Sequence, residues 1–136
     1  MMKRNHALVI FLLALIASCT KDSETTPVAT DDRDKFTGSW LCNEGSGTPF
    51  TIEITKLSGT NINIKNFSNY GDHANAVAEV SGNTLVISSQ DFNDLPGVQN
   101  IVSSGSAIYS KTGSAEKIKM SYTVDSVAFN NVVCTR

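Results

Sequence analysis

From Phe36 onward, most of the chain alternates between apolar and polar residues with a period of two. In the clearest run, four apolar residues alternate with lysine, serine and threonine: Ile118, Met120, Tyr122 and Val124. Successive side chains of a β-strand point to opposite faces, so this pattern predicts strands that bury one face. Gly, Asn, Ser and Asp clusters separate the runs, and no segment carries a helical period. The sequence therefore predicts an all-β, antiparallel domain.

Two hairpins can be placed by their turns. Residues 50–54 alternate and continue, after a turn at residues 57–60, in Ile62 and Ile64. A two-residue turn at Gly82-Asn83 pairs Val80 with Leu85 and Ala78 with Ile87, which puts all four on one face. Further runs at residues 36–43, 100–110 and 129–135 bring the total to about eight strands, with loops at residues 70–75 and 90–97. Eight strands fit either a closed up-and-down barrel or a sandwich.

Residues 1–18 have the layout of a signal peptide. Lys3 and Arg4 precede an unbroken apolar stretch over residues 7–17, which is too short to span a membrane. The run Ile16-Ala17-Ser18-Cys19 resembles the lipobox of bacterial lipoproteins. This resemblance implies cleavage of residues 1–18 and a lipid anchor on Cys19. An uncleaved signal anchor, or a secretory peptide with an incidental cysteine, is the alternative.

Among lipoproteins of this kind the residue after the cysteine influences the destination, and Thr20 implies the outer membrane, with the domain facing the periplasm or the cell surface. The polar residues 19–34 are expected to form a lipidated, flexible tether, and residues 35–136 to form the folded domain. Removing residues 1–18 changes the formal net charge from -2 to -4. This acidic balance and the scattered basic residues argue against a nucleic-acid partner. The lipid anchor implied for Cys19 would associate the protein with the membrane.

The two remaining cysteines, Cys42 and Cys134, stand near the ends of the predicted domain. The periplasm and the cell exterior are oxidising, so we expect a disulfide between them. Closing so long a loop stabilises the domain by roughly 4 kcal/mol in the chain-entropy model. Two unpaired buried thiols are the alternative, and no histidine is spaced as a further metal ligand.

The expected first strand opens with Phe36-Thr37-Gly38-Ser39-Trp40. This run resembles the Gly-x-Trp signature of lipocalins and related calycin barrels, and Arg136 matches their terminal-strand arginine, which packs on the tryptophan. The resemblance covers residues 35–136 and implies a lipocalin-like barrel of about eight antiparallel up-and-down strands. In immunoglobulin domains the core tryptophan lies between the two cysteines, whereas Trp40 precedes Cys42.

Closing such a barrel brings the first and last strands together as antiparallel neighbours. If Cys42 lies opposite Cys134, then Trp40 lies opposite Arg136, because the two pairs share one register. A cation–π contact of Arg136 with Trp40 is expected to contribute roughly 0.5 to 2 kcal/mol. A tight turn at Asp125-Ser126 would turn Cys134 outward, so either that turn is longer or a bulge shifts the last strand.

Enzymatic chemistry has little support in the sequence. His73 and Asp72 are neighbours but lack a positioned nucleophile, and the oxygen-rich residues 91–94 lack the glycine and the distal glutamate of an EF-hand loop. No catalytic residue, metal or cofactor is therefore expected. Three further carboxylates are expected on solvent faces, where they form no hydrolytic pair: Glu53, Glu79 and Glu116.

The interior of the barrel is the expected binding site. Small residues at positions 76, 78, 105 and 107 leave space there, and eight strands can enclose one small ligand. The expected function is that of a lipid-anchored, non-enzymatic envelope protein that binds a small apolar or amphipathic ligand in the barrel, or a surface partner. A core filled by side chains is the alternative to a cavity. The candidate ligand-binding residues are Trp40, Phe50, Ile52, Ile62, Ile64, Leu85, Ile87, Met120 and Tyr122.

Two other functions remain open. Residues 104–111, Ser-Gly-Ser-Ala-Ile-Tyr-Ser-Lys, resemble the Ser-Gly-x-x-Tyr loop of membrane-bound lysozyme inhibitors, with the tyrosine one residue later. This resemblance implies inhibition of a lysozyme-type hydrolase. A structural subunit at the cell surface is compatible with the Asn- and Ser-rich loops.

Overall fold

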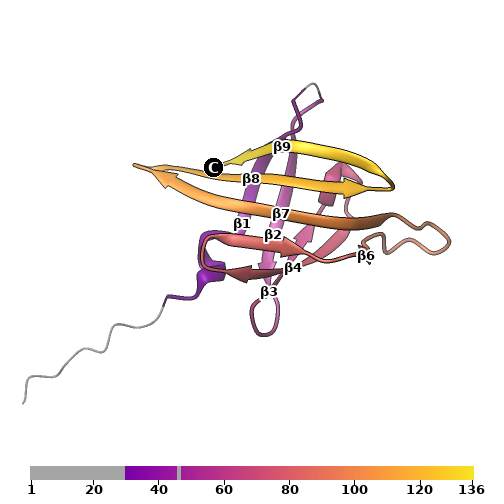
Figure 1. Cartoon of the computed structure of the whole chain (residues 1–136), viewed down its shortest axis with the longest axis horizontal. Helices are drawn as coiled ribbons and strands as arrows, with labels where there is room; N and C mark the ends of the chain where they lie inside the picture. Colours follow the sequence, from indigo (N-terminus) through magenta and orange to yellow (C-terminus); the bar gives the residue numbers. More distant parts are fainter. Residues whose placement is uncertain (1–29, 46) are drawn as a thin grey trace, which may run out of the picture.

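The computed structural model describes residues 30–45 and 47–136 as an all-β domain (Figure 1). The expected signal peptide, the lipidated Cys19 and most of the expected tether lie outside the described residues. The described elements are two 3-10 helices, η1 (Asp32–Lys35) and η2 (Phe67–Asn69), and nine strands, β1 (Gly38–Asn43), β2 (Phe50–Lys56), β3 (Asn61–Lys65), β4 (Asn75–Ser81), β5 (Thr84–Ile87), β6 (Gln90–Asp91), β7 (Ile101–Thr112), β8 (Ala115–Val124) and β9 (Val127–Thr135).

The strands close into a barrel. They pair in the order β5-β4-β3-β2-β1-β9-β8-β7-β6, every pair is antiparallel, and β5 also pairs with β7. Along β7, Ile87 of β5 lies opposite Gly105 and Gln90 of β6 lies opposite Val102. The short strand β6 therefore continues the position of β5, and the barrel has eight strand positions. This confirms the predicted eight-stranded antiparallel up-and-down barrel and excludes the sandwich.

The predicted registers can be compared pair by pair. Val80 lies opposite Leu85 across the two-residue turn, as predicted. Between β8 and β9 the turn at Asp125-Ser126 is tight, and the register shifts where Met120 faces Val132 and Tyr122 faces Phe129. One extra residue of β9 thus forms a bulge, at which Asn131 takes a φ of 62°. Of the two predicted alternatives, the bulge is correct, and it turns Cys134 inward.

Inward-facing side chains form one buried core. Trp40, Phe36, Phe67 and Phe92 are among its largest fully buried members. At Gly105 the packing is especially close, because an added Cβ would lie 3.0 Å from Tyr122 Cβ and 3.1 Å from Ile87 Cδ1. A larger residue at this position would overfill the interior.

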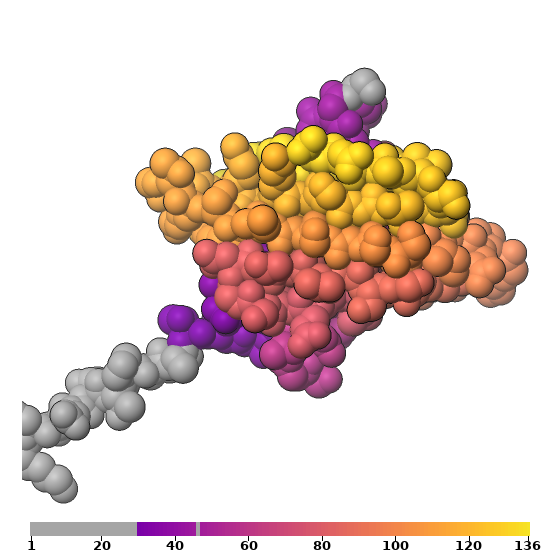
Figure 2. Space-filling model, viewed as in Figure 1, coloured from indigo at the N-terminus to yellow at the C-terminus, as the bar shows by residue number. Residues whose placement is uncertain are grey.

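Because neighbouring strands run in opposite directions, the connections gather at two ends of the barrel. The η1 end comprises residues 31–37, the turns at 57–60, 82–83 and 113–114, and Arg136. The loop end comprises residues 44–49, 66–74, 88–100 and 125–126. In the space-filling view the indigo η1 segment lies toward the lower left, and the orange loop before β7 protrudes on the right (Figure 2).

Candidate functional site

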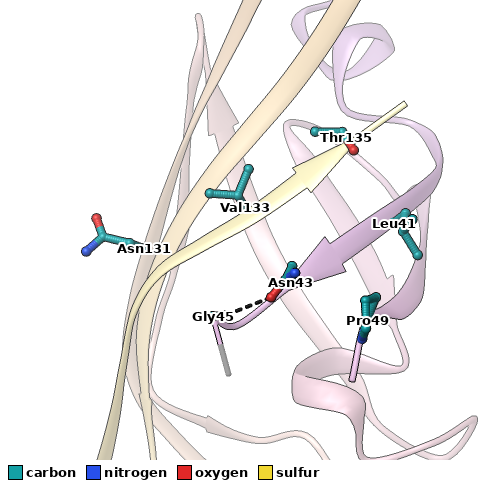
Figure 3. A pocket seen from close by; sticks show the side chains of 7 residues that line it. All are labelled: Leu41, Asn43, Gly45, Pro49, Asn131, Val133 and Thr135. Atoms are coloured by element: carbon teal, nitrogen blue, oxygen red, sulfur yellow. Dashed lines mark hydrogen bonds between the residues drawn. The ribbon is translucent and has the colours of Figure 1, made fainter. Parts of the chain in front are cut away.

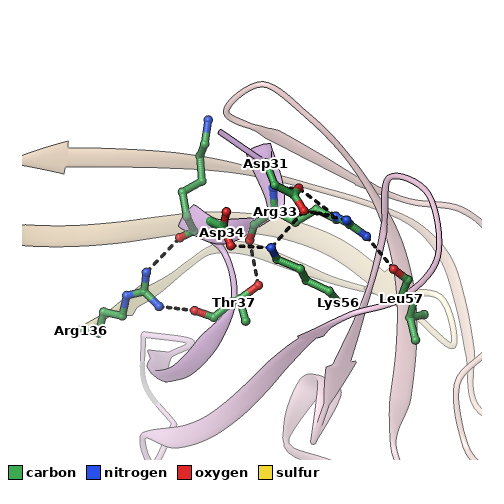
Figure 4. Close-up of polar contacts among 8 residues, drawn as sticks. Asp31, Arg33, Asp34, Thr37, Lys56, Leu57 and Arg136 are labelled. Atoms are coloured by element: carbon green, nitrogen blue, oxygen red, sulfur yellow. Dashed lines mark hydrogen bonds and ion pairs between the residues drawn. The ribbon is translucent and has the colours of Figure 1, made fainter. Parts of the chain in front are cut away.

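The η1 end is held by charged side chains of both signs (Figure 4). Asp31 accepts a hydrogen bond from the backbone N–H of Arg33 and pairs with its guanidinium at 2.7 Å. Lys56 lies 3.0 Å from Asp31 and 2.5 Å from Asp34. The guanidinium of Arg33 also donates to the carbonyl of Leu57 at 2.6 Å. Residues 31–34, which were predicted from the sequence to belong to the tether, thus contact the barrel.

Trp40 and Arg136 meet at the same end. The guanidinium carbon of Arg136 lies 4.2 Å from the centroid of the Trp40 ring, and the indole N–H donates to the carbonyl of Phe36 at 2.6 Å. Arg136 also donates to the backbone carbonyls of Thr37 and Lys35. Position 38 requires glycine, because its φ of 115° is unfavourable for residues with a side chain. An added Cβ there would also lie 2.9 Å from the Arg136 guanidinium.

Glu116 binds three donors at the η1 end. Its carboxylate accepts hydrogen bonds from Arg136 at 2.5 Å, from Lys111 at 3.0 Å and from the Tyr109 hydroxyl at 2.9 Å. These donors, Arg136 first, lower the pKa of the Glu116 carboxyl to about 2. The expectation that Glu116 lies free on a solvent face is therefore wrong. Its position in β8 has the inward parity of Ile118, and at the mouth of the barrel that direction meets Tyr109 and Arg136.

The predicted disulfide between Cys42 and Cys134 is confirmed. The two residues are directly opposite in the β1–β9 pair, with Cα atoms 3.9 Å apart. That pair has only three facing residue pairs in the described part of the chain, from Leu41 with Thr135 to Asn43 with Val133. The disulfide thus joins a short seam covalently.

The nine candidate ligand-binding residues lie inside the barrel but are packed. All nine are 0 to 7% exposed and belong to one hydrophobic cluster. Together with the close packing around Gly105, this favours the filled-core alternative over an enclosed ligand cavity.

A groove of about 440 Å³ runs along the outer side of the β1–β9 seam (Figure 3). The groove is open to solvent, because it lies on the outward face of the two strands. Four of its lining residues alternate there with buried residues of the core: Leu41, Asn43, Val133 and Thr135. The other lining residues are Gly45, Pro49 and Asn131.

At the loop end the backbone takes left-handed conformations at residues other than glycine. Ser68 has a φ of 53°, a region in which most side chains cost about 1 to 2 kcal/mol. Ser68 is 7% exposed, and its hydroxyl has no hydrogen-bond partner among the described residues. Strained backbone is enriched at functional sites. The other left-handed residues in these loops are Asn66, Asn69, Asp125 and Ser126.

Aromatic rings fill the barrel mouth beneath these loops. The Phe67 ring lies 5.1 Å from Phe92 and 4.7 Å from Tyr122, between ring centroids, and Tyr122 stacks on Phe129 at 5.2 Å. The hydroxyl of Tyr122 donates to Glu44 Oε1 at 2.5 Å. Burial, and next this hydrogen bond to Glu44, raise the pKa of Tyr122 well above its usual range.

Amide and carboxylate side chains join the loops to one another. Asn75 donates to Asp94 at 2.5 Å, and Asn100 donates to Asp125 at 2.8 Å. Asp91 accepts from the backbone N–H groups of Asn93 and Asn100. The oxygens of residues 91–94 thus organise the loop. Within residues 30–45 and 47–136, no group of three His, Cys, Asp or Glu residues is placed to hold a metal ion.

Four large apolar side chains are exposed on this end. Tyr70 is 45% exposed, Leu95 40%, Val98 45% and Val127 57%. Tyr70 contacts the Phe92 ring at 5.4 Å, and residues 100–101 are hydrogen-bonded to the turn before Val127. We call these four side chains the apolar rim. Sequence reasoning missed them, because single exposed apolar residues are ordinary and only the fold links the three segments that carry them.

Two other residues or motifs considered from the sequence are not assembled into sites. His73 lies in the loop before β4, where its carbonyl accepts from Asp94 and its neighbour Asp72 pairs with Lys65 at 3.4 Å. Residues 104–111 lie within strand β7 and not in a loop. Gly105 and Tyr109 of that run face inward, where the Tyr109 hydroxyl is bonded to Glu116. The resemblance to an inhibitor loop therefore has no counterpart in the structure.

Fold and site together define a closed eight-stranded antiparallel β-barrel with one end held by ion pairs and one end formed by apolar and acidic loops. Comparisons with family models, with curated proteins and with solved structures each returned no match. Across the described ranges, no helix has the length and apolar character that a membrane span requires.

Proposed function

We propose that this protein is a non-enzymatic binding protein of the bacterial envelope, anchored by a lipid on Cys19, that contacts an apolar or amphipathic partner through its loop end. The observation that carries the proposal is the exposure of the apolar rim on three linked segments. Apolar side chains exposed together on one surface are typical of interaction sites. The packed interior supports a partner at the loops over a ligand within the barrel.

Kinship with lipocalins is part of this proposal. Its support is the contact of Arg136 with Trp40 beside Gly38, which reproduces the arrangement implied by the resemblance.

The position of the tether also supports the loop end as the binding surface. The described chain enters the barrel through Asp31 at the η1 end. A lipid on Cys19, in the outer membrane as Thr20 implies, would therefore hold the η1 end toward the membrane. The loop end would then face away from the bilayer, where partners are accessible.

Photocrosslinking in cells tests the proposal. The full-length protein is produced with benzoylphenylalanine in place of Val98 on the apolar rim, or in place of Ile108, which is 61% exposed on the barrel wall. We expect a light-dependent adduct at Val98 and none at Ile108. The mass of the adduct separates a small ligand from a protein. Adducts of equal yield at both positions, or at Ile108 alone, would contradict binding at the loop end.

A further inference from the structure

The loop end carries negative charge without compensation from its own loops. Its segments contain no Lys or Arg, whereas the segments of the η1 end contain three acidic and three basic residues. Charge is thus separated along the barrel. The five carboxylates of the loop end are Glu44, Asp72, Asp91, Asp94 and Asp125.

Hydrogen bonding leaves most of this charge in place. In the described part of the chain, only Asp72 has a basic partner, Lys65, at 3.4 Å. The other four carboxylates accept from uncharged donors, namely amide side chains, backbone N–H groups and the Tyr122 hydroxyl. At the η1 end, in contrast, Asp31, Asp32 and Asp34 each contact a lysine or arginine.

Carboxylates of the loop end stand beside the apolar rim in the chain. Of those without a basic partner among the described residues, Asp94 directly precedes Leu95 and Asp125 is two residues from Val127. The surface of the loop end therefore combines negative charge with exposed apolar side chains.

We propose that the loop end docks a positively charged, amphipathic segment of another protein, in which lysine or arginine side chains stand beside apolar ones. This inference rests on the proposed function and names the chemistry of the partner. A field of one sign attracts an oppositely charged partner and speeds its encounter, while burial of the apolar rim supplies affinity. The same field repels nucleic acid and anionic lipid surfaces.

Peptide binding to the lipidated protein tests this inference. The mature protein is placed in phosphatidylcholine nanodiscs, and empty nanodiscs provide the baseline. Three dye-labelled peptides of equal length are titrated by fluorescence anisotropy, in which leucine alternates with lysine, with glutamine or with glutamate. At about 0.01 M salt, where the screening length is about 30 Å, we expect the lysine peptide to bind about tenfold more tightly than the glutamine peptide. At about 1 M salt, where that length is about 3 Å, the difference should vanish.

Matched charge variants locate the effect. The double variant Asp91→Asn with Asp94→Asn should weaken binding of the lysine peptide about fivefold and leave the glutamine peptide unaffected. The asparagine at position 94 still offers an oxygen to Asn75, so the loop hydrogen bond is retained. Asp34→Asn, the same chemical change at the η1 end, should leave both affinities unchanged. Thermal unfolding of each variant confirms that it is folded.

The possible outcomes separate the two proposals. If all three peptides bind equally above empty nanodiscs at every salt concentration, the charged partner is excluded and binding at the loop end stands. If Asp34→Asn weakens binding as much as the double variant, the loop end is not where the charge acts, and the inference is overturned. If none of the peptides binds above empty nanodiscs, the inference is overturned, and adducts at Val98 then decide the proposed function separately.

Discussion

At the η1 end, charged side chains of both signs contact one another, whereas at the loop end carboxylates contact uncharged donors. Six of the seven ion pairs found in the described residues lie at the η1 end, and the exception joins Lys65 to Asp72. The backbone shows the opposite distribution. Of the six described non-glycine residues with positive φ, five lie in the loops of the loop end and the sixth, Asn131, lies in the β9 bulge.

The two ends of the barrel therefore differ in what they contribute to stability. The first and last strands are joined by the disulfide and three facing residue pairs, and the η1 end adds the contact of Arg136 with Trp40 and its ion pair with Glu116. Non-glycine residues with positive φ are concentrated at the opposite end, where the strain costs stability. The stability of one end therefore permits the strain of the other, and variants of the two ends should behave differently.

The largest effect is expected from removing the disulfide. Cys42→Ala together with Cys134→Ala should lower the free energy of unfolding by about 4 kcal/mol, because the bridge closes a loop with a sequence separation of 92. Urea denaturation measures this change. Hydrogen exchange of the variant should show greater loss of protection in the loop-end half of β9, which has no described β1 partner, than beside Arg136. Equal loss along β9 would show that the Arg136 contacts do not hold the seam.

A smaller loss is expected from Arg136→Ala. This variant removes the contact over Trp40 and the hydrogen bonds to Thr37 and Glu116, and should cost about 2 kcal/mol. Lys117→Ala, at an outward position of β8, is the control and should change stability by less than about 0.5 kcal/mol. Similar losses in the two variants would contradict a specific role of the η1 end in stability.

At the loop end the expected change has the opposite sign. Ser68→Gly relieves a left-handed φ and removes a buried hydroxyl without a partner, which outweighs the added freedom of glycine in the unfolded chain. We expect a gain of about 1 kcal/mol in denaturation experiments. Ser110→Gly, within β7, is the matched control and should destabilise. Destabilisation by Ser68→Gly would show that this loop is not strained.

The smallest effect is expected in the pH dependence of stability. The pKa of Glu116 is lowered from 4.5 to about 2 in the folded protein. Its stabilising contribution is therefore complete above the unfolded-state pKa and is lost as the pH falls from about 5 toward 2. Denaturation midpoints measured across this range should fall less steeply for Glu116→Gln than for the unmodified protein. Parallel curves would exclude Glu116 as a source of acid sensitivity.

The barrel was predictable because its information is local or paired in the sequence. Period-two alternation identifies the strands at all eight barrel positions, although the short β6 lies in the predicted loop at residues 90–97. The common offset of Cys42 with Cys134 and of Trp40 with Arg136 predicts the seam register. The bulge in β9 could only be stated as one of two alternatives. A longer turn and an extra strand residue change the facing of Cys134 in the same way, and only the observed pairing of Met120 with Val132 separates them.

The two ends were harder to predict because distant residues determine them. The short helix η1 is held by Lys56 and by Asn83, whose side-chain oxygen accepts from Lys35 at 2.9 Å. Nothing in the polar composition of residues 31–34 indicates these partners. Likewise, the loop end depends on the hydrogen bond of Asn100 with Asp125 and on the contact of Tyr70 with Phe92. These are tertiary contacts between residues far apart in the sequence, which the local pattern does not specify.

The bond between β1 and β9 also determines how the domain responds to tension. Residues 42–134 form a covalent ring, and the tether leaves this ring from one side. A partner held at the loop end divides this ring into two arms, one running to Cys42 and one to Cys134. A pull between the tether and the partner loads both arms, so the chain lengthens only until the shorter arm is straight. With the tether and the C-terminus as the two points of attachment, reduction of the bond would release the full sequence separation of 92, an extra contour length of about 300 Å. Single-molecule extension with and without reductant would measure this difference directly.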